Sequence, residues 1–152
     1  MPSPLGMIGL SRHHDGIGKV AFLSADTPPC KTRDSLLGEA VRRIDGYFYG
    51  AGADFSDLPL APQGTAFQHR VWTALRAIAP GQTRRYGELA ADLATGARAV
   101  GGACRANPWV LLVPCHRIIA ANGDGGFMGA AAGAWPRLKQ YLLAHEQRCF
   151  AS

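Results

Sequence analysis

The sequence has no segment that would place it in a membrane or carry it out of the cell. Its apolar runs are far shorter than the roughly 20 residues that span a bilayer. Met1-Pro2-Ser3-Pro4 lacks the basic and apolar regions of a secretory signal. Of the 152 residues, 47% are hydrophobic and 18% charged, which excludes a disordered chain. We expect a globular cytoplasmic protein, associated with the nucleoid if its source is bacterial.

Paired cysteines are also missing. The four cysteines are scattered and none belongs to a C-x-x-C pair, which argues against a disulfide framework or a zinc ribbon. Free thiols fit a reducing cytoplasm. Cys30, His13 and His14 lack the spacing of metal ligands, so we expect neither a metal nor a cofactor.

Acidic residues are scarce in the middle of the chain. Between Thr65 and Ala106 there are six arginines against Glu88 and Asp92, which gives 6 − 2 = +4 of the net charge of +5. A basic stretch of this kind indicates either a polyanionic partner or a merely solvated face.

The order of the predicted elements indicates an α/β (α+β) protein of two domains. In the first, at 1–60, residues 7–10 and 20–24 are predicted strands around an Asp15-Gly16 turn, and residues 34–49 have helical spacing. A linker over 54–64, rich in proline and small residues, leads into a mostly helical domain at 61–152.

The second domain is predicted to contain a helix-turn-helix. Thr65 and Gln68 have the form of a capping box, and Pro80-Gly81 is expected to end the helix that they begin. Helices over 86–94 and 97–106 follow, joined by Thr95-Gly96. Pro136 can open a last helix, which we expect to bury Leu138, Tyr141, Leu142 and His145.

The helix over 97–106 contains two adjacent glycines. Each costs about 1 kcal/mol in a helix interior, so Gly101 and Gly102 need a reason. One is close packing against another helix. The other is close approach of the helix backbone to a narrow nucleic-acid surface such as a minor groove.

The segment Pro114-Cys115-His116-Arg117 places a thiol beside an imidazole. It follows the apolar residues 109–113, which read as a buried strand that Pro114 ends. A nearby base can activate a thiol as a nucleophile. Most buried cysteines are inert, however, and adjacent residues on a strand point to opposite faces.

Taken together, these motifs resemble one family, the O6-alkylguanine-DNA alkyltransferases, or methylated-DNA–protein-cysteine methyltransferases. The motifs occur in the family's order over about 65–146, and residues 1–60 resemble its ribonuclease H-like N-terminal domain only loosely. They are Tyr86-Gly-Glu-Leu-Ala, Ala97-Arg98-Ala-Val-Gly-Gly-Ala, Asn107-Pro108, Pro114-Cys115-His116-Arg117-Ile118-Ile119, Asn122-Gly123 and Leu142-Leu143-Ala144-His145-Glu146.

The resemblance implies direct, single-turnover DNA repair. A monomer would bind double-stranded DNA through the minor groove and flip out O6-alkylguanine; activity on O4-alkylthymine is left open. Cys115 would accept the alkyl group, His116 would take its proton through a water, and Glu146 would orient the imidazole. Tyr86 would act on base and phosphate, and Asn107 would brace the turn before the active-site segment. The residues implied to bind DNA are Arg98, Tyr86, Ala97, Gly101, Gly102, Arg105 and Arg84.

The same resemblance implies a pocket for the alkylated base, with some departures from the family pattern. Phe127 stands where the family usually has tyrosine, and Met128 where it has a small residue. Trp109-Val110 replaces the family's common pair of a small residue and a proline. The preferred alkyl group is therefore open. The implied lining residues are Trp109, Val113, Pro114, Ile118, Gly126, Phe127, Met128 and Gly129.

Three other functions are compatible with parts of the sequence. A damage sensor that binds lesions without repairing them would lack Cys115. A helix-turn-helix transcription factor would need long polar side chains for base readout, and the segment at 97–103 supplies few. A cysteine hydrolase would leave the basic helical segment unexplained.

Overall fold

The computed structural model describes residues 1–120 and 135–151. The chain forms two compact units. The first comprises Met1–Gln63 together with Pro108–Leu112, and the second comprises Gly64–Asn107 together with Val113–Ser152. Each unit has its own mixture of elements: a small sheet with one helix in the first, and mostly helices in the second, as the sequence predicted.

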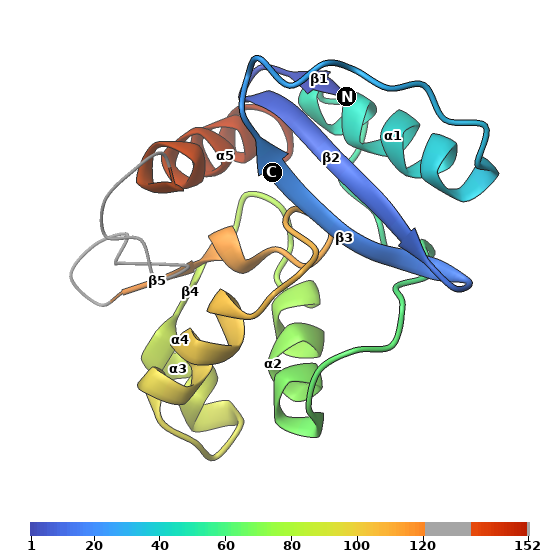
Figure 1. Cartoon of the computed structure of the whole chain (residues 1–152). Helices are drawn as coiled ribbons and strands as arrows, with labels where there is room; N and C mark the ends of the chain where they lie inside the picture. The colour runs from blue at the N-terminus through green and yellow to red at the C-terminus, as the bar shows by residue number, and fades with distance from the viewer. Residues whose placement is uncertain (121–134, 152) are drawn as a thin grey trace. The chain divides into compact units, whose positions relative to one another are not determined.

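The first unit is built on a β-hairpin (Figure 1). Strand β2, Gly6–His13, pairs antiparallel with β3, Gly16–Leu23, and the short β1, Pro2–Ser3, adds to the other edge of β2. The turn lies at the predicted place, next to His14 with its positive φ of 54°. Both strands are longer than predicted.

Helix α1, Ser35–Phe48, lies along this hairpin (Figure 1). Its N-cap is Asp34, whose carboxylate accepts hydrogen bonds from the backbone of Leu36 and Leu37 and from Arg12 of β2. The helix and the strands share an apolar core formed by residues at helical and alternating spacing: Met7, Ile8, Ile17, Val20, Ala40, Ile44, Tyr47 and Phe48.

Residues 109–113 do not form the predicted strand. Within the first unit Trp109 makes a single bridge with Val20, and its indole N–H donates to the carbonyl of Ile17 at 2.7 Å. The chain then turns, and Leu111 has a φ of 73°. The apolar run is buried as expected, but burial without a partner strand for more than one residue does not extend a sheet.

The second unit is mostly helical (Figure 1). Its elements are α2, Ala66–Arg76; β4, Arg84–Arg85; α3, Tyr86–Asp92; α4, Ala97–Arg105; the 3-10 turn η1, Cys115–Arg117; β5, Ile118–Ile119; and α5, Trp135–Cys149. The capping box of Thr65 and Gln68 is confirmed. Helix α2 ends at Arg76, before the Pro80-Gly81 that was expected to end it.

Helices α3 and α4 form the predicted helix-turn-helix, and α2 supports both. The indole N–H of Trp72 donates to the carbonyl of Ala103 at 2.9 Å, and the guanidinium of Arg70 donates to the carbonyl of Leu93 at 2.9 Å. Val100 of α4 is fully buried. The turn needs a left-handed residue, which is Ala94 at φ 54°.

Two further observations concern the described residues as a whole. None of the helices described is both long and apolar enough to cross a membrane. In the described ranges, no three His, Cys, Asp or Glu side chains gather closely enough to hold a metal ion.

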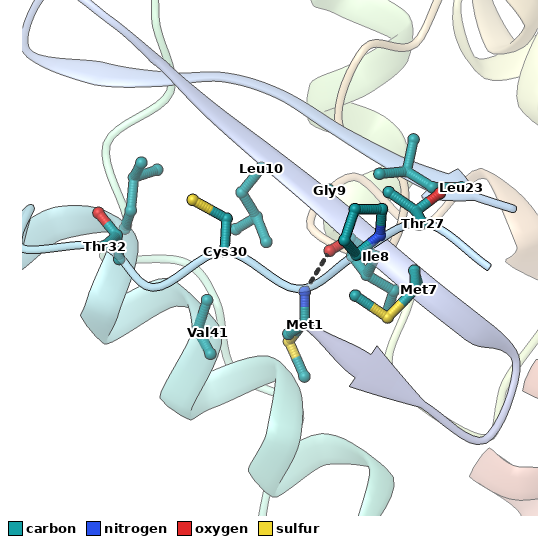
Figure 2. A pocket seen from close by; sticks show the side chains of 12 residues that line it. Met1, Met7, Ile8, Gly9, Leu10, Leu23, Thr27, Cys30, Thr32 and Val41 are labelled. Carbon is teal, nitrogen blue, oxygen red and sulfur yellow. Dashed lines mark hydrogen bonds between the residues drawn. The ribbon is translucent and has the colours of Figure 1, made fainter. Parts of the chain in front are cut away.

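The first unit has an apolar pocket of about 240 Å³ between its hairpin, the segment after β3 and α1. Figure 2 shows Leu10, Cys30 and Val41 on its walls, with the N-terminal ammonium of Met1 donating to the carbonyl of Ile8 at 2.7 Å. None of the residues lining this pocket is among those implied to act on alkylguanine.

Candidate active site

Cys115 begins η1, and its side chain is completely buried. The turn that places it there follows Pro114, whose ψ of 66° is neither helical nor fully extended. Burial raises the pKa of the Cys115 thiol to about 12, and a hydrogen bond from Asn107 acts in the opposite direction. The thiol is therefore protonated in the resting protein, and a nucleophilic role requires a base.

Asn107 lies between the end of α4 and the cysteine. Its backbone N–H donates to the carbonyl of Cys104 at 3.2 Å. Its side-chain Nδ2 donates to the carbonyl of Val113 at 2.9 Å and to Cys115 Sγ at 3.1 Å. One buried residue, through its backbone and its side chain, thus connects the last turn of α4 to the backbone and the sulfur of the thiol-bearing segment.

His116 is the nearest candidate base in the sequence, and its ring is held by Glu146 of α5. The His116 Nε2 and Glu146 Oε1 atoms are 2.8 Å apart, and both side chains are buried. No hydrogen bond within the described part of the chain joins His116 directly to Cys115. Burial lowers the pKa of His116 although the Glu146 hydrogen bond acts to raise it, so the ring is neutral near pH 7.

The Glu146 carboxylate has a second partner in Arg117. The Nε and Nη2 atoms of Arg117 donate to Glu146 at 2.8–3.2 Å, and Nη1 donates to the carbonyl of Ile78 at 2.7 Å. Burial acts to raise the pKa of Glu146, but the bonds from His116 and Arg117 outweigh it and hold that pKa well below its usual range. Glu146 is therefore ionised.

Lys139 is a buried cation on the same face of α5 as Glu146. Its Nζ donates to the carbonyl of Ile118 at 2.7 Å, and its charge acts to lower the pKa of Cys115. A positive charge here favours the thiolate, because the sulfur becomes negative when it loses its proton.

Tyr86 lies close to the two buried thiols of the unit. Burial, together with the negative charge that Cys104 and Cys115 would carry, raises the pKa of the Tyr86 hydroxyl. The tyrosine therefore keeps its proton and can donate a hydrogen bond. The parallel pairing of β4 with β5 fixes its position, since Arg85 pairs with Ile119 just after η1.

The glycines of α4 do not serve helix packing. Among the described residues, a Cβ added to Gly102 would meet nothing within 4 Å, and one added to Gly101 would touch only the Tyr86 ring at 4.0 Å. The first of the two alternatives left open by the sequence is thus wrong for both positions. The exposed side of α4 presents bare backbone, beside the exposed residues Ala97, Arg98 and Arg105.

The arginines near this face differ in how they are held. Arg84 pairs with Asp92 at 2.8 Å and is half-buried. Arg98, Arg105 and Arg85 are exposed, and among the described residues their guanidinium groups have no ion-pair partner. Arg98, Arg105 and Arg85 can therefore contact a phosphate directly. Arg84 can do so only if it gives up its ion pair with Asp92.

The implied pocket residues divide into three groups. Val113, Pro114 and Ile118 are buried in the second unit, next to Cys115 in the chain. Trp109 belongs to the core of the first unit, where its indole is bonded to Ile17. Gly126, Phe127, Met128 and Gly129, as well as the Asn122-Gly123 motif, lie outside the described residues.

Sequence reasoning assigned no role to Arg117 or Lys139. It expected Leu138, Tyr141, Leu142 and His145 to be buried on α5; Leu142 and His145 are, whereas Leu138 and Tyr141 are only half-buried. Lys139, Leu142 and Glu146 are spaced i, i+3, i+7 and define the buried face. That spacing was the available signal, but a lysine and a glutamate are rarely buried.

Comparison with known proteins gives a consistent picture. The family described as "6-O-methylguanine DNA methyltransferase, DNA binding domain" matches residues 66–148, and its "ribonuclease-like domain" matches residues 1–62. A methylated-DNA–protein-cysteine methyltransferase of Methanosarcina acetivorans is 39% identical, covering 97% of this chain and 96% of its own.

Solved structures agree with these matches. An O6-methylguanine methyltransferase of Mycobacterium tuberculosis has a TM-score of 0.80 and 32% identity, covering 100% of this chain and 93% of that one. A structure of Mycobacterium tuberculosis OGT in complex with DNA has a TM-score of 0.79 and 36% identity, covering 97% of this chain and 91% of that one.

Proposed function

This chain belongs to the 6-O-methylguanine DNA methyltransferase family, and we propose that it repairs O6-alkylguanine in DNA by transferring the alkyl group to Cys115. The observation that carries the assignment to this residue is the buried group in which Asn107 contacts the sulfur and Glu146 holds the adjacent His116. Cys30 and Cys149 are exposed, and the sulfur of Cys149 has only a long contact of 3.8 Å to Nδ1 of His145 among the described residues.

Glu146 and His116 supply the base. An ionised carboxylate 2.8 Å from Nε2 accepts a hydrogen bond, so Nε2 carries the ring proton and Nδ1 has the free electron pair. Nδ1 takes the thiol proton through a water molecule. The imidazolium that forms is stabilised by Glu146, and the thiolate by Asn107 and the charge of Lys139.

The transfer step is a displacement at the alkyl carbon. The S–C bond forms while the C–O6 bond breaks, and its electron pair moves onto the base. Tyr86, which stays protonated, donates a hydrogen bond toward a ring nitrogen of the base. The guanine anion that leaves takes up a proton from solvent, and the imidazolium of His116 returns to solvent the proton that it took from the thiol. The product on the protein is a thioether with no acidic proton and no good leaving group. Each molecule therefore acts once.

DNA binding is assigned to the exposed side of α4, with the base flipped out so that its alkyl group can reach the thiol. No described residue lies within 4 Å of a Cβ added to Gly102, which supports close approach of the α4 backbone to a minor groove. Arg98 fills the space left by the base, and Arg105 and Arg84 contact phosphates. Ala97, Gly101 and Tyr86 complete this surface.

The remaining assignments follow from the same premise. Residues 1–60 form the N-terminal domain and 61–152 the alkyltransferase domain, and the protein acts as a monomer. The pocket for the alkylated base is assigned to Val113, Pro114 and Ile118, together with Trp109 and with residues 126–129, which lie outside the described part of the chain. The four cysteines are unpaired, which suits a reducing cytoplasm, and binding of DNA would place the protein at the nucleoid of a bacterium.

One experiment tests the function. The protein is incubated with a duplex oligonucleotide containing O6-methylguanine, and its peptides are then examined by mass spectrometry. One methyl group on the Cys115 peptide is expected, together with loss of methylguanine from the DNA. Binding of the duplex without any methylated peptide would identify a damage sensor instead, and a methyl on another cysteine would contradict the site.

A further inference from the structure

Arg117 is the one side chain of the Cys-His-Arg turn for which the transfer step gives no role, although it is buried and fully bonded. It is 5% exposed, and its guanidinium reaches two other elements of the second unit, Glu146 of α5 and the carbonyl of Ile78 after α2. A buried guanidinium needs such partners, because an uncompensated charge is strongly destabilising. The choice of Glu146 as partner is informative, since that carboxylate also holds His116.

The two partners divide the Glu146 oxygens in a definite way. His116 Nε2 and Arg117 Nη2 both contact Oε1, at 2.8 Å each, while Arg117 Nε is 3.0 Å from Oε2 and 3.2 Å from Oε1. The backbone N–H of Gly81 contributes a longer contact to Oε2, at 3.4 Å. A forked guanidinium fixes the plane of a carboxylate, which a single-point contact from an ammonium does not do.

We propose that Arg117 is a positioning residue for alkyl transfer: by holding the Glu146 carboxylate ionised and fixed in plane, it keeps His116 in the Nε2–H form and leaves Nδ1 as the proton acceptor. This proposal rests on the proposed function, because it explains how the base for Cys115 is prepared. It adds to that function a residue that touches neither the substrate nor the sulfur.

The charged groups around His116 explain how Arg117 keeps its imidazole ring neutral. His116 is acted on by the charges of Glu146 and Lys139 on α5 and of Arg117 within its own turn. If Glu146 had His116 as its only cationic partner, the pair would draw a proton onto the imidazole and fill Nδ1. Arg117 supplies the positive charge that Glu146 needs, so the imidazole stays neutral and basic until the thiol gives up its proton.

The test compares Arg117→Met and Arg117→Lys with the wild-type protein. The single-turnover rate of methyl transfer is measured as a function of pH, and the 15N shifts of the His116 ring nitrogens are measured by NMR. In Arg117→Met the acidic limb of the rate profile should move upward by about 1–3 pH units, the range for removing a close charge. Arg117→Lys keeps the positive charge, so its acidic limb should lie close to that of the wild-type protein.

A matched control is Arg43→Met in the first unit. Arg43 is also an arginine shared between two carboxylates, Glu39 and Asp57. Its loss removes a similar bonded arginine without touching His116, so the pH profile should stay in place. A merely structural role for Arg117 predicts slower transfer in both Arg117 variants with an unmoved acidic limb, and that result would overturn the proposal.

The NMR measurement keeps the proposal testable if Arg117→Met does not fold or if the protein transfers no methyl group. In the wild-type protein near pH 7, Nε2 should be protonated and Nδ1 not. A ring protonated at Nδ1 would overturn the proposal whatever the activity. Absence of methyl transfer with the expected ring form would instead count against the proposed function alone.

Discussion

The side-chain amide of Asn107 donates hydrogen bonds both to the sulfur of Cys115 and to the carbonyl of Val113. The same residue closes the end of α4 through its backbone bond to Cys104. One residue thus connects the sulfur to the helix that carries the proposed DNA-binding face. Alkylation of Cys115 replaces a hydrogen-bonding thiol by a bulkier thioether at this point.

The methylated protein should be less stable than the free protein. The added methyl enters a fully buried site, and overpacking typically costs about 1–3 kcal/mol. Scanning calorimetry of fresh protein, and of protein reacted with methylguanine DNA and then freed of it, provides the measurement. An unchanged or higher melting temperature after methylation would contradict this expectation.

Cys115→Ala should abolish methyl transfer and leave DNA affinity nearly unchanged, because the thiol accepts the alkyl group and is buried away from the exposed side of α4. His116→Ala should slow transfer by on the order of 10²–10⁴, the usual range for acid–base assistance. Stopped reactions with labelled methylguanine DNA measure both rates. Cys149→Ala, at an exposed thiol, is the control and should react like the wild type.

Gly102→Ala should separate stability from DNA binding. The new methyl meets no atom of the described residues within 4 Å, and replacing a helical glycine by alanine stabilises by up to about 1 kcal/mol. DNA affinity should nevertheless fall, because the α4 backbone can no longer approach the groove as closely. Thermal melting and fluorescence anisotropy with a duplex measure the two effects. Gly38→Ala in α1, whose Cβ also meets nothing, is the control and should leave affinity unaltered.

Arg98→Ala should impair repair of methylguanine in duplex DNA far more than reaction with a free alkylguanine base, since the free base needs no flipping. The affinity of the wild-type protein and of Arg98→Ala for DNA should fall as the salt concentration rises, as expected where arginines displace counterions from phosphates. Rates on the two substrates are compared directly. Equal losses on both would mean that Arg98 supports folding or the pocket.

Stability should be highest between about pH 6.5 and 9. Below 6.5, the ordinary value for histidine, His116 of the unfolded chain takes up a proton that the folded protein binds only at lower pH, so acid favours unfolding. Above 9.0, the unfolded chain loses the Cys115 proton that the folded protein retains to about pH 12, so alkali also favours unfolding. Melting temperatures from pH 5 to 10 should show both slopes, and Cys115→Ala should reduce the alkaline one.

The sequence alone determined the helix caps and tight turns, because these depend on residues that lie close together in the chain. The capping residues Thr65 and Asp34, the hairpin turn before Gly16 and the helix-turn-helix at 86–105 all depend on side chains within a few positions of one another. The proposed alkyl acceptor, Cys115, could be located through the family's motif. Backbone geometry imposed by such short-range bonds is largely independent of what packs against it.

Tertiary structure decided the rest. Residues 109–113 look like a strand, but a strand needs a partner along its length, and only Trp109 found one in Val20. The roles of Arg117 and Lys139 depend on which buried groups they meet, namely Glu146, Ile78 and Ile118. Those partners lie 21 to 39 residues away along the chain. A charged side chain becomes part of a core only where distant segments supply its hydrogen bonds, and no short-range pattern records that.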